Sequence, residues 1–389
     1  MLLIFDSHPV QYKAPVYRRL AQLRPGSFKV VYATDVTVRG HRDREFGEVV
    51  AWDTPLLDGY DHLVLNNERG TPFAGFRSLG GRGVFELLRR ERPKAAILSQ
   101  FLYAFDFAAW LGCLMLGVPI WIRQETQDEA FVRPAWKSAL RGIAYRVAYA
   151  PVAHAFAFGA LNREHLVRHG IAPERISFAR YATPEPPGVD AAQRDAWRTR
   201  VRKQFSVAPE ETLLLFSGKF IDKKNPGLLL EALRLLPPDE QGRFRVLFVG
   251  AGPLEAELLA QATGLPGRVD FAGFVNQSEI ASFYAAADIL VLPSRRAGET
   301  WGLVVNEALQ AGCGVVMTDA VGCHREFGGW ERVRVISDGD ARACEAALRD
   351  LAHFPRDFGW CADAMRDYSV EAAALAIAQR IDQLEKTGA

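Results

Sequence analysis

Short runs of apolar residues alternate with segments of helical character along almost the whole chain of 389 residues. Residues 1–5 (MLLIF) form the first run, and residues 213–218 (LLLFSG) and 314–318 (GVVMT) are two of the later ones. Apolar runs without polar alternation are typical of parallel strands whose two faces are both covered by helices. The pattern therefore predicts an α/β fold in which each half of the chain is doubly wound and Rossmann-like.

A proline-rich segment, residues 183–188 (TPEPPG), interrupts this alternation near the middle of the chain. Segments of this composition are typical of linkers. We therefore expect two domains, residues 1–188 and residues 189–364, with a cleft between them. The periodicity also predicts a helix over residues 370–386, which it assigns to neither domain.

The composition is that of a globular protein, with 49% hydrophobic and 24% charged residues. A net charge of +1 gives no argument for a nucleic-acid partner. The five cysteines have no CxxC spacing, which predicts reduced thiols. Asp6 ends the first apolar run too early for a signal peptide. The stretch 107–122 is too short to span a bilayer, and we expect a buried helix over residues 107–116 followed by a strand over residues 119–123. We therefore expect a cytoplasmic protein.

The segment around residues 298–307 (GETWGLVVNE) lies between two apolar runs, residues 288–294 and 314–318. Strand, loop, helix and strand in this order predict a right-handed βαβ unit, which binds ligands at the carboxyl ends of its strands. A helix that begins near Trp301–Gly302 offers N–H groups to an anion. Glu299 and Glu307 accept hydrogen bonds, and hydroxyl groups suit them as donors. Together these features indicate a phosphorylated sugar or a sugar nucleotide. The alternative is that Glu299 only stabilises the helix end and Glu307 is solvated.

Residues 293–322 (PSRRAGETWGLVVNEALQAGCGVVMTDAVG) resemble the nucleotide-sugar signature of retaining glycosyltransferases of family 4. That family carries two glutamates separated by seven residues, here Glu299 and Glu307. The resemblance implies that Glu299 contacts the donor sugar and Glu307 the ribose hydroxyls. It further implies the two-domain GT-B fold, in which the C-terminal segment 365–389 joins the first domain.

A basic loop follows the apolar run that opens the second half, at residues 218–226 (GKFIDKKNP). Gly218 permits close backbone approach, and three lysines at one strand end repel one another unless an anion lies there. A solvated basic loop is the alternative. The loop resembles the diphosphate site of the same family, which implies this role for Lys219 and Lys224. The family more often has arginine at the first position, and a lysine supplies only a point charge.

Other segments of the second half match the same family at the nucleotide cleft. The resemblance implies that Gly250 and Gly252 line the cleft and that the loop with Phe274 and Val275 touches the base through backbone groups. It also places the helix start in the site, and its residues are Thr300, Trp301, Gly302 and Leu303. A GxG sequence after a strand is common in α/β proteins, so these glycines add little by themselves.

The first half carries residues 7–12 (SHPVQY) directly after its first strand. They resemble an HPxQYxxP subgroup that is associated with bacterial polysaccharide and cell-envelope glycan assembly. The resemblance implies that His8, Gln11 and Tyr12 lie on the acceptor or donor-sugar side of the cleft. For His8, a purely structural role is the alternative. Arg123 and Glu125 follow the strand after which many family members place a histidine, so we expect polar contacts to a sugar from these two.

We expect no metal ion and no other cofactor. His165 and His169 are four residues apart on an expected helix but have no evident third ligand, which predicts a solvated helix face. The expected helix 135–149 carries Lys137, Arg141 and Arg146 between aromatic residues. We expect it to pack on the sheet with its basic edge in water. Peripheral contact with an anionic membrane is the alternative.

The sequence thus predicts a retaining glycosyltransferase that transfers a sugar from a nucleotide-diphosphate sugar to a saccharide or a lipid-linked saccharide. Lys219, Lys224 and the helix start would stabilise the charge on the leaving diphosphate, and Glu299 would orient the donor sugar. Two alternatives stay open. They are a GT-B sugar-nucleotide epimerase, which needs no acceptor, and a non-catalytic subunit that binds nucleotide sugars.

Overall fold

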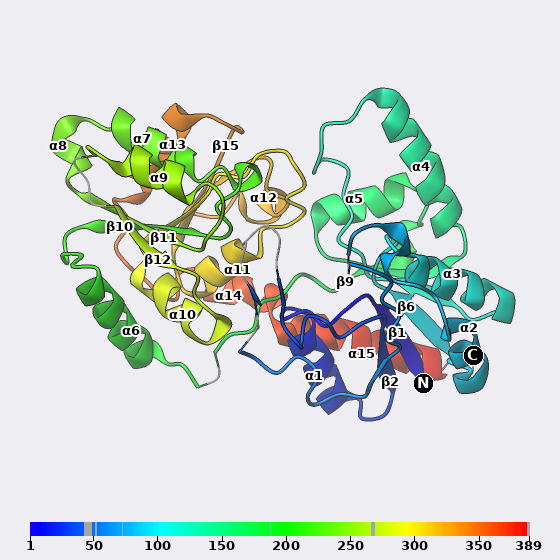
Figure 1. Cartoon of the computed structure of the whole chain (residues 1–389). Coiled ribbons are helices and arrows are strands. Elements are labelled where there is room, and N and C mark those ends of the chain that lie inside the picture. The colour runs from blue at the N-terminus through cyan, green and yellow to red at the C-terminus, as the bar shows by residue number, and fades with distance from the viewer. Residues whose placement is uncertain (43–48, 51–52, 72, 187, 266–268, 387–389) are drawn as a thin grey trace.

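The computed structural model describes residues 1–42, 49–50, 53–71, 73–186, 188–265 and 269–386. Two parallel sheets lie side by side, each covered by helices (Figure 1). The first is built from the first half of the chain and the second from the second half. The doubly wound α/β architecture that the apolar runs predict is confirmed.

Seven parallel strands make the first sheet, and Leu2–Asp6 is buried along its whole length near the middle. In spatial order the strands are β5 (His62–Val64), β2 (Phe28–Tyr32), β1 (Leu2–Asp6), β6 (Ala95–Leu98), β7 (Ile120–Ile122), β8 (Val152–Ala157) and β9 (Ile176–Phe178). The helices are α1 (Ala14–Leu23), α2 (Val84–Glu91), α3 (Ala104–Leu116), α4 (Ala135–Tyr149) and α5 (Ala160–Arg168). A short antiparallel pair, β3 (His41–Arg42) and β4 (Val49–Val50), is separate from this sheet.

Six parallel strands make the second sheet, with β10 and β13 at its centre. In spatial order they are β12 (Val269–Gly273), β11 (Phe244–Val249), β10 (Thr212–Ser217), β13 (Ile289–Leu292), β14 (Gly314–Thr318) and β15 (Val333–Ile336). The helices are α6 (Ala191–Gln204), α7 (Gly227–Leu235), α8 (Pro238–Gln241), α9 (Glu255–Ala262), α10 (Gln277–Ala286), α11 (Leu303–Gln310), α12 (His324–Phe327), α13 (Ala341–Leu351) and α14 (Ala362–Met365).

The C-terminal helix α15 (Val370–Lys386) returns to the first half of the chain and packs against α1 (Figure 1). Its buried face carries Ala373, Ala374, Ile377, Ala378 and Ile381, which join the core on one side of the first sheet. Three alanines on this face let the helix backbone approach α1 closely. The pattern of apolar residues predicts the bounds of α15, whereas its place on the first domain is implied by the family resemblance and not by the pattern.

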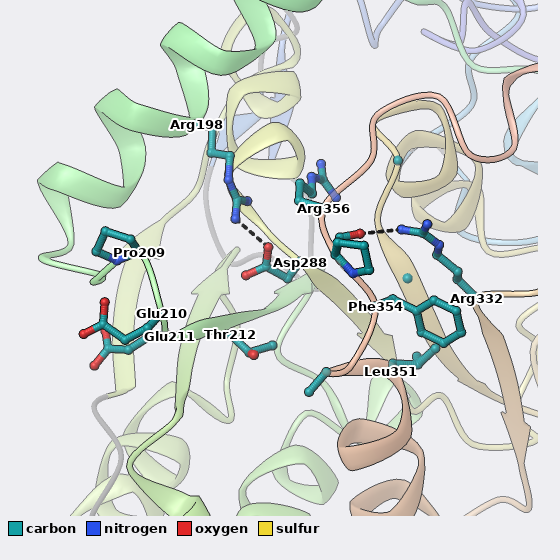
Figure 2. A pocket seen from close by; sticks show the side chains of 14 residues that line it. Arg198, Pro209, Glu210, Glu211, Thr212, Asp288, Arg332, Leu351, Phe354 and Arg356 are labelled. Atoms are coloured by element: carbon teal, nitrogen blue, oxygen red, sulfur yellow. Dashed lines mark hydrogen bonds and ion pairs between the residues drawn. The ribbon is translucent and has the colours of Figure 1, made fainter.

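Charged side chains brace the second sheet at the amino ends of its strands, away from the cleft. Arg198 and Arg202 of α6 reach Asp288, with nitrogen–oxygen distances of 2.7 and 3.0 Å. Asp288 also accepts a hydrogen bond from the backbone N–H of Leu213. Figure 2 shows Arg198 and Asp288 beside a cavity of about 240 Å³ at this edge. Both carboxylate oxygens are engaged, so we interpret this cluster as an anchor for α6.

Two helices of the first domain are far more exposed than we expect from the sequence. The apolar stretch predicts a buried helix from residue 107, but in α3 the side chains of Phe107, Leu111 and Met115 are exposed. In α4, which we expect to pack on the sheet, only Tyr149 is buried. Both expectations of burial are wrong. The sequence shows the apolar periodicity of a helix, but it does not show which helix face packs against the rest of the protein.

Candidate active site

The predicted site residues of the second domain follow the carboxyl ends of its strands. Gly218 follows β10, Gly250 follows β11, and the loop with Glu299 follows β13. In the first domain, residues 7–12 follow β1 and residues 123–133 follow β7. The two edges meet where the Gly298 N–H donates to the Ala130 carbonyl at 2.7 Å. Loops of both domains therefore contribute to one interdomain site.

Glycine is required where the loops after β10 and β11 touch. The Gly218 N–H donates to the Val249 carbonyl, and the Gly250 N–H donates to the Gly273 carbonyl. At Gly250, φ is +137°, and an added Cβ would lie 1.9 Å from the Gly218 carbonyl oxygen. At Gly252 an added Cβ would lie 2.6 Å from the Phe220 carbonyl oxygen. These glycines hold the loop backbones in close contact at the edge of the site.

Glu299 and the basic loop form an ion-pair cluster. The Nζ of Lys224, in the 3₁₀ turn Asp222–Lys224, lies 2.5 Å from Glu299 Oε2, and Lys223 Nζ lies 4.0 Å from it. Lys223 also donates to the Gly298 carbonyl at 2.9 Å. Burial favours the neutral acid, but the two lysines outweigh it and lower the pKa of Glu299. Glu299 therefore supplies the negative charge beside two of the three lysines of the basic loop, which would otherwise repel one another.

Glu307, in the second turn of α11, is held by two tyrosine hydroxyls. Tyr12 of the first domain donates to Oε1 at 3.1 Å, and Tyr284 of α10 donates to Oε2 at 2.7 Å. The Tyr284 hydroxyl also lies 3.1 Å from Ser217 Oγ. Burial raises the pKa of Glu307 to about 7, although the hydroxyl donors oppose this shift. The solvated alternative for Glu307 is therefore wrong.

The start of α11 differs slightly from the prediction. The helix begins at Leu303, with Gly302 in the left-handed conformation (φ +100°) as its N-cap. Thr300 precedes it and is partly buried. Trp301 is buried between the domains, where its indole N–H donates to Asn306 Oδ1 at 2.8 Å. The contact with Gly159 is so close that an added Cβ there would lie 2.5 Å from the indole. Trp301 therefore fixes the domain interface.

Phe274 and Val275 lie in the loop between β12 and α10, and both are partly buried. Val275 packs against the core of the second domain. Asn276 then caps α10 by accepting a hydrogen bond from the Gln277 N–H. The structure places this loop beside that of Gly250, through the bond to Gly273.

On the first-domain side, His8 and Gln11 lie in the same loop as Tyr12. His8 Nδ1 lies 2.8 Å from Ser7 Oγ, and its ring packs against Phe73. Gln11 lines an interdomain cavity of about 570 Å³ that also reaches Tyr284 and Glu307. The loop therefore brings polar side chains of the first domain to the carboxylate of the second.

Arg123 and Glu125 are both engaged within the protein. Arg123 is buried, donates to the Ala179 carbonyl at 3.2 Å, and lies over the ring of Phe158. Glu125 accepts a hydrogen bond from the Tyr181 hydroxyl. Both side chains therefore contact the segment that follows β9, close to the domain crossover.

The expectation of a solvated helix face at His165 and His169 is wrong, because both side chains are buried. Asp128 supplies a third group, with Oδ1 at 2.8 Å from His165 Nδ1 and Oδ2 at 3.5 Å from His169 Nε2. Its oxygens also bind Arg141 at 2.8 Å and Arg168 at 3.2 Å. The guanidinium groups already neutralise the single carboxylate, and we assign the cluster as an ion-pair network.

Several residues of the site carry no sequence signal. Tyr284 lies on α10 without a motif, and Tyr181 follows β9. Tyr284 and Tyr181 reach the carboxylates of Glu307 and Glu125 only through tertiary packing. Lys223, by contrast, is one of the three lysines of the basic loop, and the sequence points to it as part of an anion site.

Residues 198–357 match the model of a family described as "Glycosyl transferases group 1". The matched residues lie within the second domain and span about its whole length. Over 209 residues the chain is 31% identical to D-inositol 3-phosphate glycosyltransferase 2 of Catenulispora acidiphila. This alignment covers 50% of the chain and 47% of that relative, so the chain spans about half the length of the curated relative it matches.

Solved structures resemble the chain over its whole length. Anabaena Alr3699/HepE in complex with UDP superposes with a TM-score of 0.69 at 16% identity, covering 98% of this chain and 99% of that one. WaaG, a glycosyltransferase involved in lipopolysaccharide biosynthesis, superposes with a TM-score of 0.60 at 17% identity, with the same coverage. The fold of the chain is GT-B, as the resemblance implies.

Proposed function

We propose that the protein is a retaining glycosyltransferase of family 4 that transfers a sugar from a nucleotide-diphosphate sugar to a saccharide or lipid-linked saccharide acceptor. The observation that carries the proposal is the Lys224–Glu299 pair at the carboxyl edge of the second sheet, within the segment that matches the group 1 family. A cation and a hydrogen-bond acceptor 2.5 Å apart suit a ligand that has phosphate at one end and hydroxyls at the other.

In this proposal the second domain binds the donor. Lys219 and Lys224 bind the diphosphate together with the start of α11, and stabilise the negative charge that grows as the sugar leaves. Glu299 orients the donor sugar, and Glu307 accepts hydrogen bonds from the ribose. These cations take the place of a metal ion, so the reaction is metal-independent.

The first domain binds the acceptor. Tyr12 donates a hydrogen bond to Glu307, and Gln11 lines the same cavity as Glu307, so the acceptor side borders the nucleotide site. Bacterial polysaccharide or cell-envelope glycan assembly is the pathway that the HPxQYxxP pattern supports. The acceptor hydroxyl would attack on the face from which the diphosphate leaves, with the leaving phosphate taking its proton.

The experiment is a melting-temperature screen against UDP, GDP, ADP, dTDP and CMP in EDTA, with their sugar conjugates. A ligand at about 100 times its dissociation constant stabilises the folded state by about 2.7 kcal/mol, which is readily measured. We expect a shift with one nucleoside diphosphate that is lost in Glu307→Ala. No shift with any of these ligands would contradict the proposal.

Mass spectrometry of the reaction then separates the three candidate functions. A transferase releases nucleoside diphosphate and extends a saccharide acceptor. An epimerase converts the sugar nucleotide without an acceptor, and a non-catalytic subunit binds it and leaves it unchanged. Full loss of transfer in EDTA, restored by manganese, would refute the metal-independent mechanism.

A further inference from the structure

Helix α4 presents its apolar side chains to the outside of the molecule. Four side chains on this helix are about 60% exposed, namely Trp136 (61%), Leu140 (59%), Ile143 (59%) and Val147 (61%). Their spacing of four, three and four residues places all of them on one face of the helix. An ordinary surface helix turns such a stripe toward the core, so the orientation here is reversed.

The opposite face of α4 makes the contacts with the protein. At 3.6 residues per turn, Tyr145 and Tyr149 lie across the helix from the stripe. Tyr149 is buried, and Tyr145 packs against the rings of His165 and His169. These contacts fix the helix so that the stripe points away from the body, and Figure 1 shows α4 at the periphery of the first domain.

Charge on this segment is entirely positive. Residues 130–150 contain four basic residues, namely Arg133, Lys137, Arg141 and Arg146, and no acidic residue. Arg141 is engaged by Asp128, whereas Lys137 and Arg146 are exposed and flank the stripe. An apolar stripe between exposed cations is complementary to a surface that is apolar inside and negatively charged at its boundary.

A second exposed apolar row lies on α3, the neighbouring helix. Phe107, Leu111 and Leu114 are 42, 51 and 41% exposed and share one face. The indole N–H of Trp110 donates to the Ala148 carbonyl at 3.0 Å, which joins α3 to the C-terminal end of α4. Exposed apolar side chains of this extent mark an interaction surface.

We propose that α4 lies in the surface of an anionic lipid bilayer, with its stripe among the acyl chains and Lys137 and Arg146 at the headgroups. Among the described residues, no helix is long and apolar enough to cross a membrane. The attachment is therefore peripheral, with the helix lying in the plane of the interface. The loop 123–133 leads from Arg123 and Glu125 directly into α4, so membrane attachment places the acceptor side of the cleft near the bilayer.

The test is sedimentation of the full chain with vesicles of phosphatidylcholine, with and without phosphatidylglycerol. Two double variants remove the stripe (Leu140→Ser with Ile143→Ser) or the charge (Lys137→Glu with Arg146→Glu). We expect each to weaken binding to the anionic vesicles by about tenfold or more. Matched controls are Leu259→Ser and the pair Arg200→Glu with Lys203→Glu, all exposed in the second domain.

The control variants should bind as the unmodified protein does, and every variant should keep its melting temperature. Added salt should release the protein, because the lipid contact is partly electrostatic. Equal binding to both kinds of vesicle, or none to either, would overturn the proposal. So would a dimer that dissociates in the Leu140→Ser, Ile143→Ser variant without vesicle binding, since a second copy would then cover the stripe. This readout needs no sugar transfer, so it stands or fails independently of the proposed function.

Discussion

Tyr12 of the first domain donates a hydrogen bond to Glu307 of the second at 3.1 Å, across 295 residues of sequence. Tyr284 holds the other oxygen of the same carboxylate at 2.7 Å. Both oxygens of this partly buried side chain are thus engaged, and its burial raises the pKa of Glu307 to about 7. The residue proposed to bind ribose is therefore also a contact between the domains.

Nucleotide affinity should rise as the pH increases through about 7. Ribose hydroxyls donate hydrogen bonds, so they bind the charged carboxylate of Glu307 better than the neutral acid. Calorimetric titration with the nucleoside diphosphate from the screen measures this affinity between pH 6 and 8. The range extends roughly one pH unit on either side of the pKa of about 7. In Glu307→Gln, affinity should be weaker and should rise less steeply with pH, because only the titration of the nucleotide's own phosphate then remains; a pH profile parallel to that of the unmodified protein would refute the assignment.

The same carboxyl group should make folding stability depend on pH. Its pKa is about 7 in the folded protein and about 4.3 in an unfolded chain, so the folded state binds the proton more tightly. This contribution is complete below about pH 4 and is lost as the pH rises to about 7, by up to about 3 kcal/mol. The free energy of unfolding in urea should show this pH dependence in the unmodified protein and should lack it in Glu307→Gln. Asp106, whose pKa burial also raises to about 7, is common to both proteins and cancels in the difference.

Tyr12→Phe should move the pH midpoint of nucleotide binding upward. The Tyr12 hydroxyl stabilises the charged form of Glu307, so its removal leaves the carboxylate with one donor fewer. The lost hydrogen bond should also cost about 1 kcal/mol of folding stability. Tyr145→Phe is the control, because its hydroxyl lies near Arg141 and away from Glu307. A midpoint that stays in place or moves downward would show that Tyr12 does not act on this carboxylate.

The sequence predicts the parts of the fold that depend on local pattern. Apolar runs mark the strands, and the proline-rich segment marks the crossover. The helix start at Gly302 is likewise predicted to within a residue or two, because a strand, a short loop and a helix leave few other positions.

The parts that fail depend on contacts between distant segments. Nothing near Tyr284 signals that it will hold Glu307, and nothing near Asp128 signals that it will meet His165. Helix α4 illustrates the same limit. The sequence predicts the helix correctly, but its apolar face lies toward solvent and not toward the sheet. The residues that form a helix are set by local sequence, whereas the segments that pack against it are set by the tertiary structure.

Gly250→Ala should be strongly destabilising. The new methyl group would lie 1.9 Å from the Gly218 carbonyl oxygen, and φ is +137° at this position. Steric overlap with backbone at an unfavourable φ should cost about 3 kcal/mol or more. Gly242→Ala is the control, because nothing lies within 4 Å of its added Cβ, and its φ is −64°. Urea unfolding should place the control within about 0.5 kcal/mol of the unmodified protein; a similarly small effect at Gly250 would mean that the two loops can separate freely.

Lys224→Met should impair both stability and transfer, and a second substitution should separate the two effects. In this variant the buried Glu299 loses the cation at 2.5 Å and keeps only Lys223 at 4.0 Å, so its pKa should rise. The free energy of unfolding should fall by about 3 kcal/mol. Adding Glu299→Gln removes the unpaired charge and should restore most of the melting temperature. Transfer should not return, because the proposed site has then lost both its phosphate cation and its sugar acceptor group.

Lys203→Met, on the exposed face of α6, controls for the loss of a lysine elsewhere and should change neither property. The decisive comparison is between the double variant and the unmodified protein, at equal stability. If the double variant transferred sugar at the original rate, the Lys224–Glu299 pair would be only a structural bridge between the loops after β10 and β13. If instead stability returned while transfer stayed lost, the pair would act in binding or turnover, because folding alone could no longer explain the defect.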